Sequence, residues 1–157
     1  MTTNLTIQTV LAVETPNLRA FTDAQAADRP KPGSWSRKEE LGHLIDSASN
    51  NHQRFIRAQH EPEYRGPGYA QDDWVRSHAY HDLPWTALVD LWQQYNWLLS
   101  EVVKRIPEDR LSNQCHIAAY PPFTLAWVIE DYILHMQHHL DHILRREVIT
   151  QYPGASL

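Results

Sequence analysis

Histidines gather near the end of this chain. Four of its ten histidines lie within the eight residues from His135 to His142. His135 and His139 are four residues apart, as are His138 and His142, so a helix would place both rings of each pair on one face. Such a pair can supply two ligands to one divalent cation, as in HExxH zinc proteases, although Met136 stands here in place of that motif's glutamate. Two ligands bind weakly, and an inward histidine can equally be a hydrogen-bonded core residue.

Helical periodicity distinguishes the two pairs. At about 100° per residue, the apolar side chains of this segment point in one direction; they are Leu125, Ile129, Tyr132, Ile133, Met136, Leu140 and Ile143. His139 falls at the edge of this apolar face and His135 one step further round, whereas His142 and His138 lie progressively closer to solvent. We therefore expect His135 and His139 to face inward, with a third ligand supplied by a facing helix of a bundle.

Four long helices are predicted to position these residues. A capping box, in which Ser36 and Glu39 satisfy each other's backbone N–H groups, marks the start of the second. Their expected bounds are Leu5–Phe21, with a bend or restart at Pro16; Ser36–Gln59; Pro84–Arg105; and a last helix from the N-cap Thr124 to Val148.

The connections between these helices lack strand signals. Residues 60–83 form a long connection that contains a candidate short helix at Asp72–His78, and residues 107–122 are expected to be irregular. No segment alternates convincingly between apolar and polar residues with period two. The sequence therefore predicts an all-α four-helix bundle that forms a single domain over residues 1–157.

Composition limits the classes of function. The 157 residues carry 14 Lys and Arg against 19 Asp and Glu, a net charge of −5, which argues against a nucleic-acid binder. The single cysteine, Cys115, excludes an intrachain disulfide and is typical of a reducing compartment. No signal-peptide pattern and no apolar run of about 18 residues is present. We expect a soluble, cytoplasmic protein that does not act on a membrane.

Two histidines of the second helix are candidates for the third ligand. His52 lies along the apolar stripe of that helix, whereas His43 points nearly opposite. Periodicity alone therefore favours His52. A polar face formed by His43, Ser47 and Asn50 would make His43 suitable if this helix were buried on two sides.

Three separated motifs resemble those of one protein superfamily. Trp35-Ser36 followed by Gly42-His43-Leu44-Ile45-Asp46-Ser47 resembles the W-S…H-x-x-D-S segment of the DinB/YfiT-like superfamily. The run from Tyr132 to Ile143 resembles its C-terminal Y-x-x-H-x-x-H-H-L/I-x-x-I, and Tyr69-x-x-x-x-Trp74 is similar to its aromatic-bearing loop. The three motifs occur in order and cover nearly the whole chain.

The resemblance implies a fold, a cofactor and a chemistry. It implies a DinB-like four-helix bundle, commonly a homodimer, with a long connection between the second and third helices. By the matching motif positions, His43, His135 and His139 would hold a divalent cation, Zn or Ni being the leading candidates. Relatives of this kind include S-transferases that use a low-molecular-weight thiol and many members described only as candidate metal-dependent hydrolases. The resemblance therefore implies a small-molecule substrate. The alternative is a non-catalytic dimeric bundle that binds a metal or a small molecule.

Other residues carry more than one interpretation. Asp46 either orients a ligand, acts as a base or is a solvated helix carboxylate. Tyr69 and Trp74 either wall the pocket or pack the loop onto the bundle. Cys115 is expected to be an ordinary, partly buried thiol rather than a nucleophile.

Overall fold

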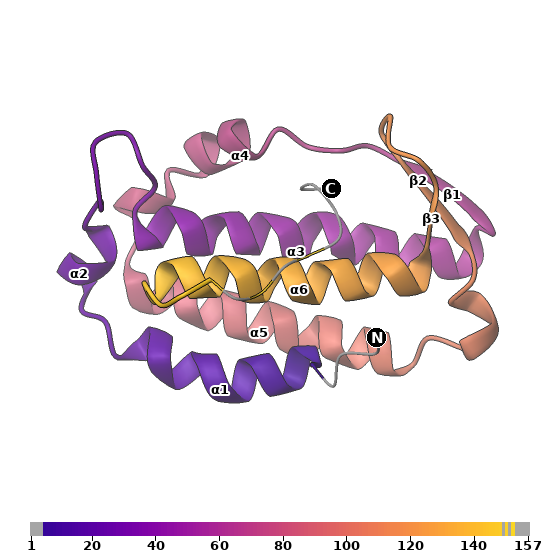
Figure 1. Cartoon of the computed structure of the whole chain (residues 1–157), viewed down its shortest axis with the longest axis horizontal. Helices are drawn as coiled ribbons and strands as arrows, with labels where there is room; N and C mark the ends of the chain where they lie inside the picture. The colour runs from indigo at the N-terminus through magenta and orange to yellow at the C-terminus, as the bar shows by residue number, and fades with distance from the viewer. Residues whose placement is uncertain (1–4, 149, 151, 153–157) are drawn as a thin grey trace.

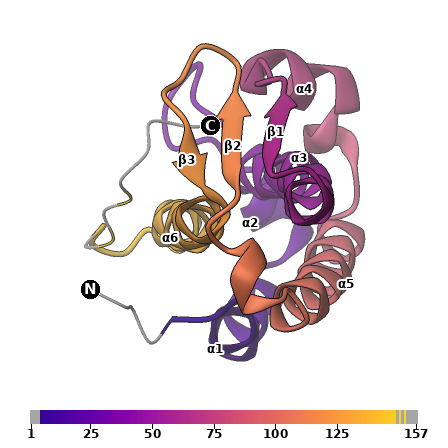
Figure 2. The same cartoon turned by 90° about the vertical axis from the view of Figure 1, so that its right-hand side faces the viewer.

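The computed structural model describes residues 5–148, 150 and 152. Within these residues four long helices run roughly along one axis (Figures 1 and 2). They are α1 (Ile7–Arg19), α3 (Arg37–His60), α5 (Trp85–Lys104) and α6 (Leu125–Ile143). The predicted four-helix bundle is therefore confirmed.

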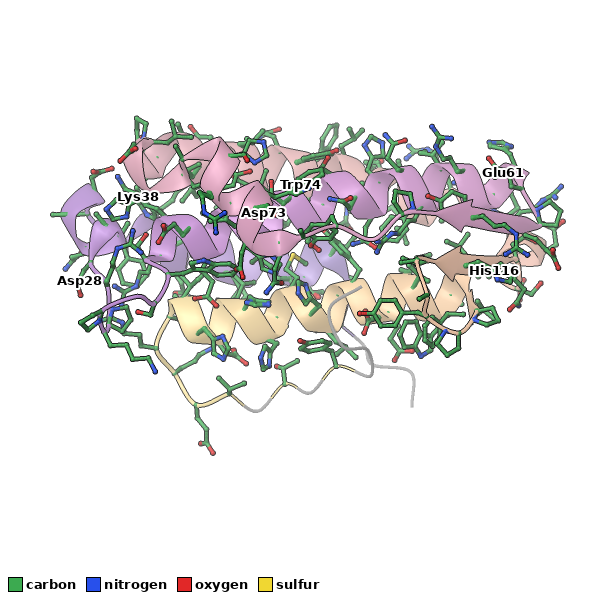
Figure 3. All side chains as sticks on the ribbon, turned by 90° about the horizontal axis from the view of Figure 1, so that it is seen from above. Asp28, Lys38, Glu61, Asp73, Trp74 and His116 are labelled. Atoms are coloured by element: carbon green, nitrogen blue, oxygen red, sulfur yellow. The ribbon has the colours of Figure 1, made fainter. Side chains whose placement is uncertain are left out.

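Short elements join the long helices. A five-residue helix, α2 (Asp23–Ala27), and two 3₁₀ turns, η1 (Tyr80–Asp82) and η2 (Glu108–Arg110), were not predicted. The expected short helix of the long connection is present as α4 (Gln71–His78). It lies over the middle of α3, where Asp73 and Trp74 are labelled in Figure 3.

Side chains cap the N-termini of the two helices that carry the histidine cluster. Oγ of Ser36 accepts from the backbone N–H of Glu39 at 3.3 Å, and the Glu39 carboxylate accepts from the N–H of Ser36 at 2.8 Å. This is the predicted capping box, which satisfies two otherwise free N–H groups of α3. Thr124 caps α6 in the expected way, by accepting from the N–H of Trp127 at 3.2 Å.

Two expected helix boundaries are wrong. Helix α1 continues through Pro16 instead of restarting there. Pro16 and Ala12 both lie on the exposed face, so water can bond the Ala12 carbonyl that proline leaves without a donor. Helix α6 ends at Ile143, five residues before the predicted end at Val148, and Arg145 then adopts a left-handed φ of 51°.

A small sheet replaces part of the irregular connections. Its strands are β1 (Glu63–Gly66), β2 (Gln114–Ile117) and β3 (Phe123–Thr124), in the order β1-β2-β3. β1 pairs with β2 in parallel, and β2 pairs with β3 antiparallel. The sheet lies at the end of the bundle where α3 finishes, beside the labelled Glu61 and His116 of Figure 3. Strands of two to four residues are too short to display a period of two, which is why the sequence did not reveal them.

Apolar side chains of the four long helices fill the core. The largest of them are Trp85 and Trp92 of α5, which are 1% and 0% exposed. Among the described residues, no helix combines the length and apolar character needed to cross a lipid bilayer.

Candidate metal centre

Neighbouring helices bring three histidines together. His43 lies in the second turn of α3, and His135 and His139 occupy successive turns of α6. α3 and α6 lie side by side in both Figure 1 and Figure 2. Since residues four apart share a helix face, the two α6 rings point towards α3 together.

His43 faces inward because α3 is surrounded. The helix packs against α5, α6, α4 and η1, and every residue from Leu41 to Ala48 is buried. Because every side of this stretch is buried, the side that carries His43 also faces the interior of the protein. His52, which periodicity favours, instead lies with its Nδ1 3.0 Å from the Tyr95 hydroxyl of α5. The structure thus brings His43, and not His52, to the α6 histidines.

The three imidazoles are close enough to share one ion. One ring nitrogen from each of His43, His135 and His139 lies within 4.8 Å of the other two. The Nε2 atoms of His43 and His135 are 3.2 Å apart. Two nitrogens on one tetrahedral zinc, with Zn–N bonds of about 2.0–2.1 Å, lie about 3.3 Å apart. In metal-free protein the same distance suits a hydrogen bond in which one of the two nitrogens carries the hydrogen.

Burial keeps two of these imidazoles neutral. His43 is 0% exposed and His135 is 5% exposed. Burial, with a smaller contribution from the nearby His139, lowers the pKa of His43 to about 3. Burial and the neighbouring histidines also lower the pKa of His135 well below its usual value. Neutral imidazoles are the form that binds a metal. The donor set therefore fits a divalent cation.

Glu40 orients the third histidine, and the sequence analysis missed it. Its Oε1 accepts from Nδ1 of His139 and from Nδ1 of His142, both at 3.0 Å. A carboxylate on one nitrogen of a histidine fixes the tautomer and leaves the other nitrogen for a metal. Glu40 precedes His43 by three residues and shares its helix face, a spacing too common among helical carboxylates to single it out.

Glu40, His139 and His142 form a second group of possible ligands. One ligand atom from each lies within 4.8 Å of the other two. The His142 side chain is 42% exposed, as expected from helical periodicity, so this group is more open to water than the first. His138, expected to be exposed, is half-buried, and its Nδ1 donates to the Thr150 carbonyl at 3.0 Å.

Asp46 is a buried carboxylate whose contacts lie outside the histidine cluster. It is 1% exposed, which rules out a solvated carboxylate. Its Oδ1 accepts from the Tyr80 hydroxyl at 2.6 Å and lies 3.1 Å from Nδ1 of His78. Burial outweighs these two interactions and raises the pKa of Asp46. Asp46 therefore joins α3 to His78 at the end of α4 and to Tyr80 of η1, and its described partners include none of the three clustered histidines.

Aromatic rings cover the cluster. The Trp35 ring lies 5.2 Å from that of His43, measured between centroids. Tyr152, from the segment after α6, lies 5.3 Å from His135 and 5.1 Å from His138. Such rings exclude water from the imidazoles and strengthen the electrostatic interactions there.

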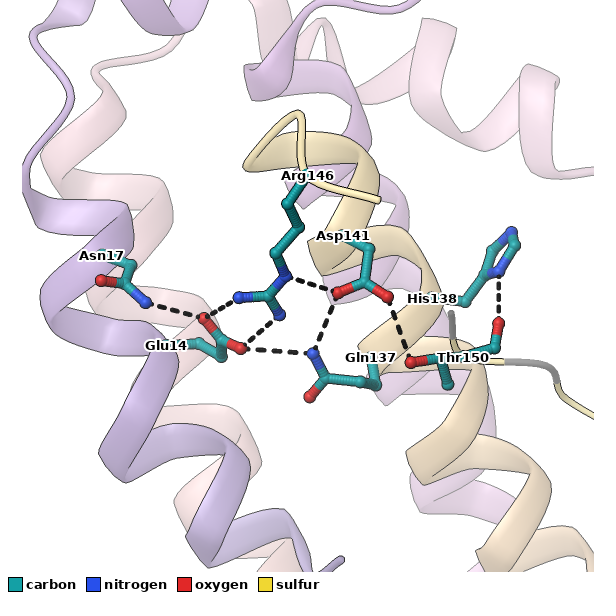
Figure 4. A network of polar contacts seen from close by, with 7 residues as sticks. All are labelled: Glu14, Asn17, Gln137, His138, Asp141, Arg146 and Thr150. Carbon is teal, nitrogen blue, oxygen red and sulfur yellow. Dashed lines mark hydrogen bonds and ion pairs between the residues drawn. The ribbon is translucent and has the colours of Figure 1, made fainter. Parts of the chain in front are cut away.

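A polar network holds the segment after α6 against the bundle (Figure 4). The Arg146 guanidinium donates to Glu14 of α1 at 2.5 Å and to Asp141 of α6 at 2.6 Å. The hydroxyl of Thr150 donates to Asp141 at 3.1 Å. These contacts hold Arg146 and Thr150 against the bundle. Both residues lie between the end of α6 and Tyr152.

The remaining candidates lie outside the histidine cluster. The rings of Tyr69 and Trp74 contact each other, with centroids 5.4 Å apart. Tyr69 also hydrogen-bonds Ser47 of α3, and Trp74 lines a cavity together with Ile45 of α3, so the pair packs the long connection onto the bundle. Cys115 is 0% exposed on β2, and burial raises the pKa of its thiol to about 11. A thiol in that state is a poor nucleophile, as expected.

The sequence matches one family model over most of its length. Residues 9–143 match the model described as the DinB superfamily. Among curated proteins, no sequence matches this chain.

Solved structures with the same fold are of two kinds. The chain is similar to YfiT from Bacillus subtilis, described as a probable metal-dependent hydrolase with an unusual four-helix bundle topology. The TM-score is 0.71 at 21% identity, over 88% of this chain and 82% of that one. It is also similar to a mutant of the mycothiol-dependent maleylpyruvate isomerase, with a TM-score of 0.60 at 16% identity. That alignment covers 89% of this chain but 63% of the isomerase, so this chain spans less than two thirds of the isomerase's length.

Proposed function

Because this chain belongs to the DinB superfamily, we propose that it is a metal-dependent enzyme in which His43, His135 and His139 hold one divalent cation. The observation that carries the proposal is the convergence of three imidazoles from two helices, with one nitrogen of each within 4.8 Å of the others. Imidazole donors suit Zn and Ni, which are the ions we propose.

Three protein ligands are typical of catalytic rather than structural zinc sites, which keep a position open for water or substrate. A cation held there would supply Lewis-acid chemistry that activates either a water molecule or a thiol.

The protein's own residues prepare this site. Burial holds His43 and His135 in the neutral form that a cation requires. Glu40 holds the hydrogen of His139 on Nδ1. Trp35 and Tyr152 shield the cluster from bulk water.

The substrate we propose is a small molecule, with two reaction classes. Hydrolysis accords with the description of YfiT, and transfer involving a low-molecular-weight thiol accords with that of the mycothiol-dependent isomerase. We propose further that the chain acts as a single-domain homodimer in the cytoplasm. Exposed apolar side chains support the dimer, since Leu91 and Leu98 of α5 and Ile56 of α3 are 39–48% exposed.

The test uses purified, untagged protein loaded with Zn or Ni. One assay panel measures hydrolysis of esters and amides, and a second measures transfer of small thiols to an electrophilic chromophore. We expect one panel to respond to metal-loaded protein and not to the His135→Ala variant. Equal activity of that variant would contradict the proposal. Bound metal with both panels silent, and a small molecule that raises the melting temperature, would favour the non-catalytic alternative.

A further inference from the structure

A cavity rich in arginine lies beside the second half of α3. Its volume is about 280 Å³, and Arg54, Arg57 and Arg65 line it together with Asn50, Gln53 and Tyr64. Among the described residues no acidic side chain lines it, although the whole chain carries a net charge of −5. Its lining residues come from the second half of α3 and from β1 and the residue after it.

Arg54 forms the buried part of this cavity. It is 1% exposed, and within the described part of the chain its guanidinium makes two long hydrogen bonds, at 3.3 Å to Asn51 Oδ1 and 3.5 Å to the Pro67 carbonyl. Among the described residues Arg54 makes no ion pair within 4.0 Å; Tyr69, Tyr64, Cys115 and Asp131 act on its charge electrostatically. A guanidinium has five N–H donors, and a buried cation without close partners is unfavourable. Burial accordingly lowers the pKa of Arg54.

The other two arginines form the open rim. Nε of Arg57 donates to Gln53 at 3.2 Å, which leaves the rest of its guanidinium available. Arg65 has one acidic neighbour, Glu63, at 3.8 Å, and these side chains are 68% and 70% exposed. An ion pair so long and so exposed contributes little and is easily exchanged.

We propose that this cavity binds the anionic group of a small molecule, either a carboxylate or a phosphate. Guanidinium groups match the geometry of both anions through paired N–H···O bonds. The volume is at the lower limit of small-ligand pockets, which suits one acidic group and its immediate neighbours.

The cavity is separate from the histidine cluster. Arg54 follows His43 by eleven residues on the same helix, which corresponds to about 16 Å along the axis. The inference therefore goes beyond the proposed metal chemistry, and metal-free protein is sufficient to test it.

Isothermal titration calorimetry on the metal-free full chain at low ionic strength tests the proposal. Inorganic phosphate and citrate are titrated separately. Saturable binding of phosphate alone would identify a phosphate-bearing ligand, and saturable binding of citrate alone a carboxylate-bearing one; either supports the proposal. The absence of saturation by both anions at millimolar concentrations would overturn it.

Variants locate the binding. Arg57→Gln and Arg65→Gln change exposed side chains, so we expect them to fold and to weaken binding about tenfold each. Glu63→Gln removes the competing carboxylate and is expected to strengthen binding. Arg105→Gln is the matched control. The Arg105 side chain is 71% exposed and pairs with Glu101 at the end of α5, away from the cavity. Unchanged binding in both rim variants, or an equal loss in Arg105→Gln, would overturn the assignment.

Discussion

Replacement of Glu40 tests how the histidine cluster is held. Glu40 contacts His139 and His142 through one oxygen, at 3.0 Å from each Nδ1. Loss of a carboxylate that orients a metal-binding histidine costs about 10–100-fold in metal affinity, which is about 1.4–2.7 kcal/mol. Glu40→Gln keeps an accepting oxygen but loses the charge, and charge-assisted hydrogen bonds are about twice as strong as neutral ones. We therefore expect a loss of about tenfold for Glu40→Gln and about a hundredfold for Glu40→Ala.

His142→Ala is the matched control. It removes the exposed histidine that shares the Glu40 oxygen, and it leaves the bond between Glu40 and His139 in place. Competition with a chromophoric chelator measures the zinc affinity of each purified variant. We expect His142→Ala to bind zinc like the unmodified protein. If it loses as much affinity as Glu40→Ala, the ion binds to Glu40, His139 and His142, and the assignment of His43 and His135 as ligands is refuted.

Three further predictions concern stability and reactivity. Arg146→Gln leaves the buried Glu14 carboxylate without its ion pair. Breaking a fully buried pair costs about 3–5 kcal/mol, but the Arg146 side chain is 38% exposed, so we expect the free energy of unfolding in urea to fall by about 2 kcal/mol. Burial raises the pKa of Glu14, but its hydrogen bonds to Arg146, Asn17 and Gln137 outweigh burial and lower the pKa below 4.5. The stabilisation is therefore present above pH 4.5 and lost as the pH falls through the folded-state pKa of Glu14. An equally steep loss of stability in acid for Arg146→Gln would contradict this prediction. Gly42→Ala places a Cβ 2.1 Å from a ring carbon of Tyr80 and should cost about 1–3 kcal/mol or more, with an unchanged melting temperature as the contrary result. Cys115, whose pKa is raised to about 11, should resist iodoacetamide in native protein at pH values where urea-unfolded protein is labelled; rapid native labelling would disprove its burial.

The sequence predicted the α6 half of the cluster well. Helix α6 has one apolar face, so periodicity places His135 and His139 on the correct side. Helix α3 has no such face between residues 41 and 48, because neighbours cover it all round. His43 was therefore reached through the resemblance to a family and not through periodicity, which favoured His52.

Contacts made across long sequence separations were not predictable. Glu40 meets His139 across 99 residues, and only the packing of α3 on α6 brings them together. Strands β1 and β2 are four residues each, and parallel pairing between residues 63–66 and 114–117 joins two connections that carry no strand pattern of their own.

Pro16 was predicted to interrupt α1, but its exposed position lets the helix continue.

Metal content tests the central claim most directly. Untagged protein is incubated with Zn or Ni, desalted and analysed by inductively coupled plasma mass spectrometry beside His43→Ala and His139→Ala, with circular dichroism to check that each variant stays helical. The proposed site predicts one ion per chain in the unmodified protein and loss of most of it in both helical variants. Full occupancy in either variant, or no retained ion in the unmodified protein, would contradict a three-histidine metal site.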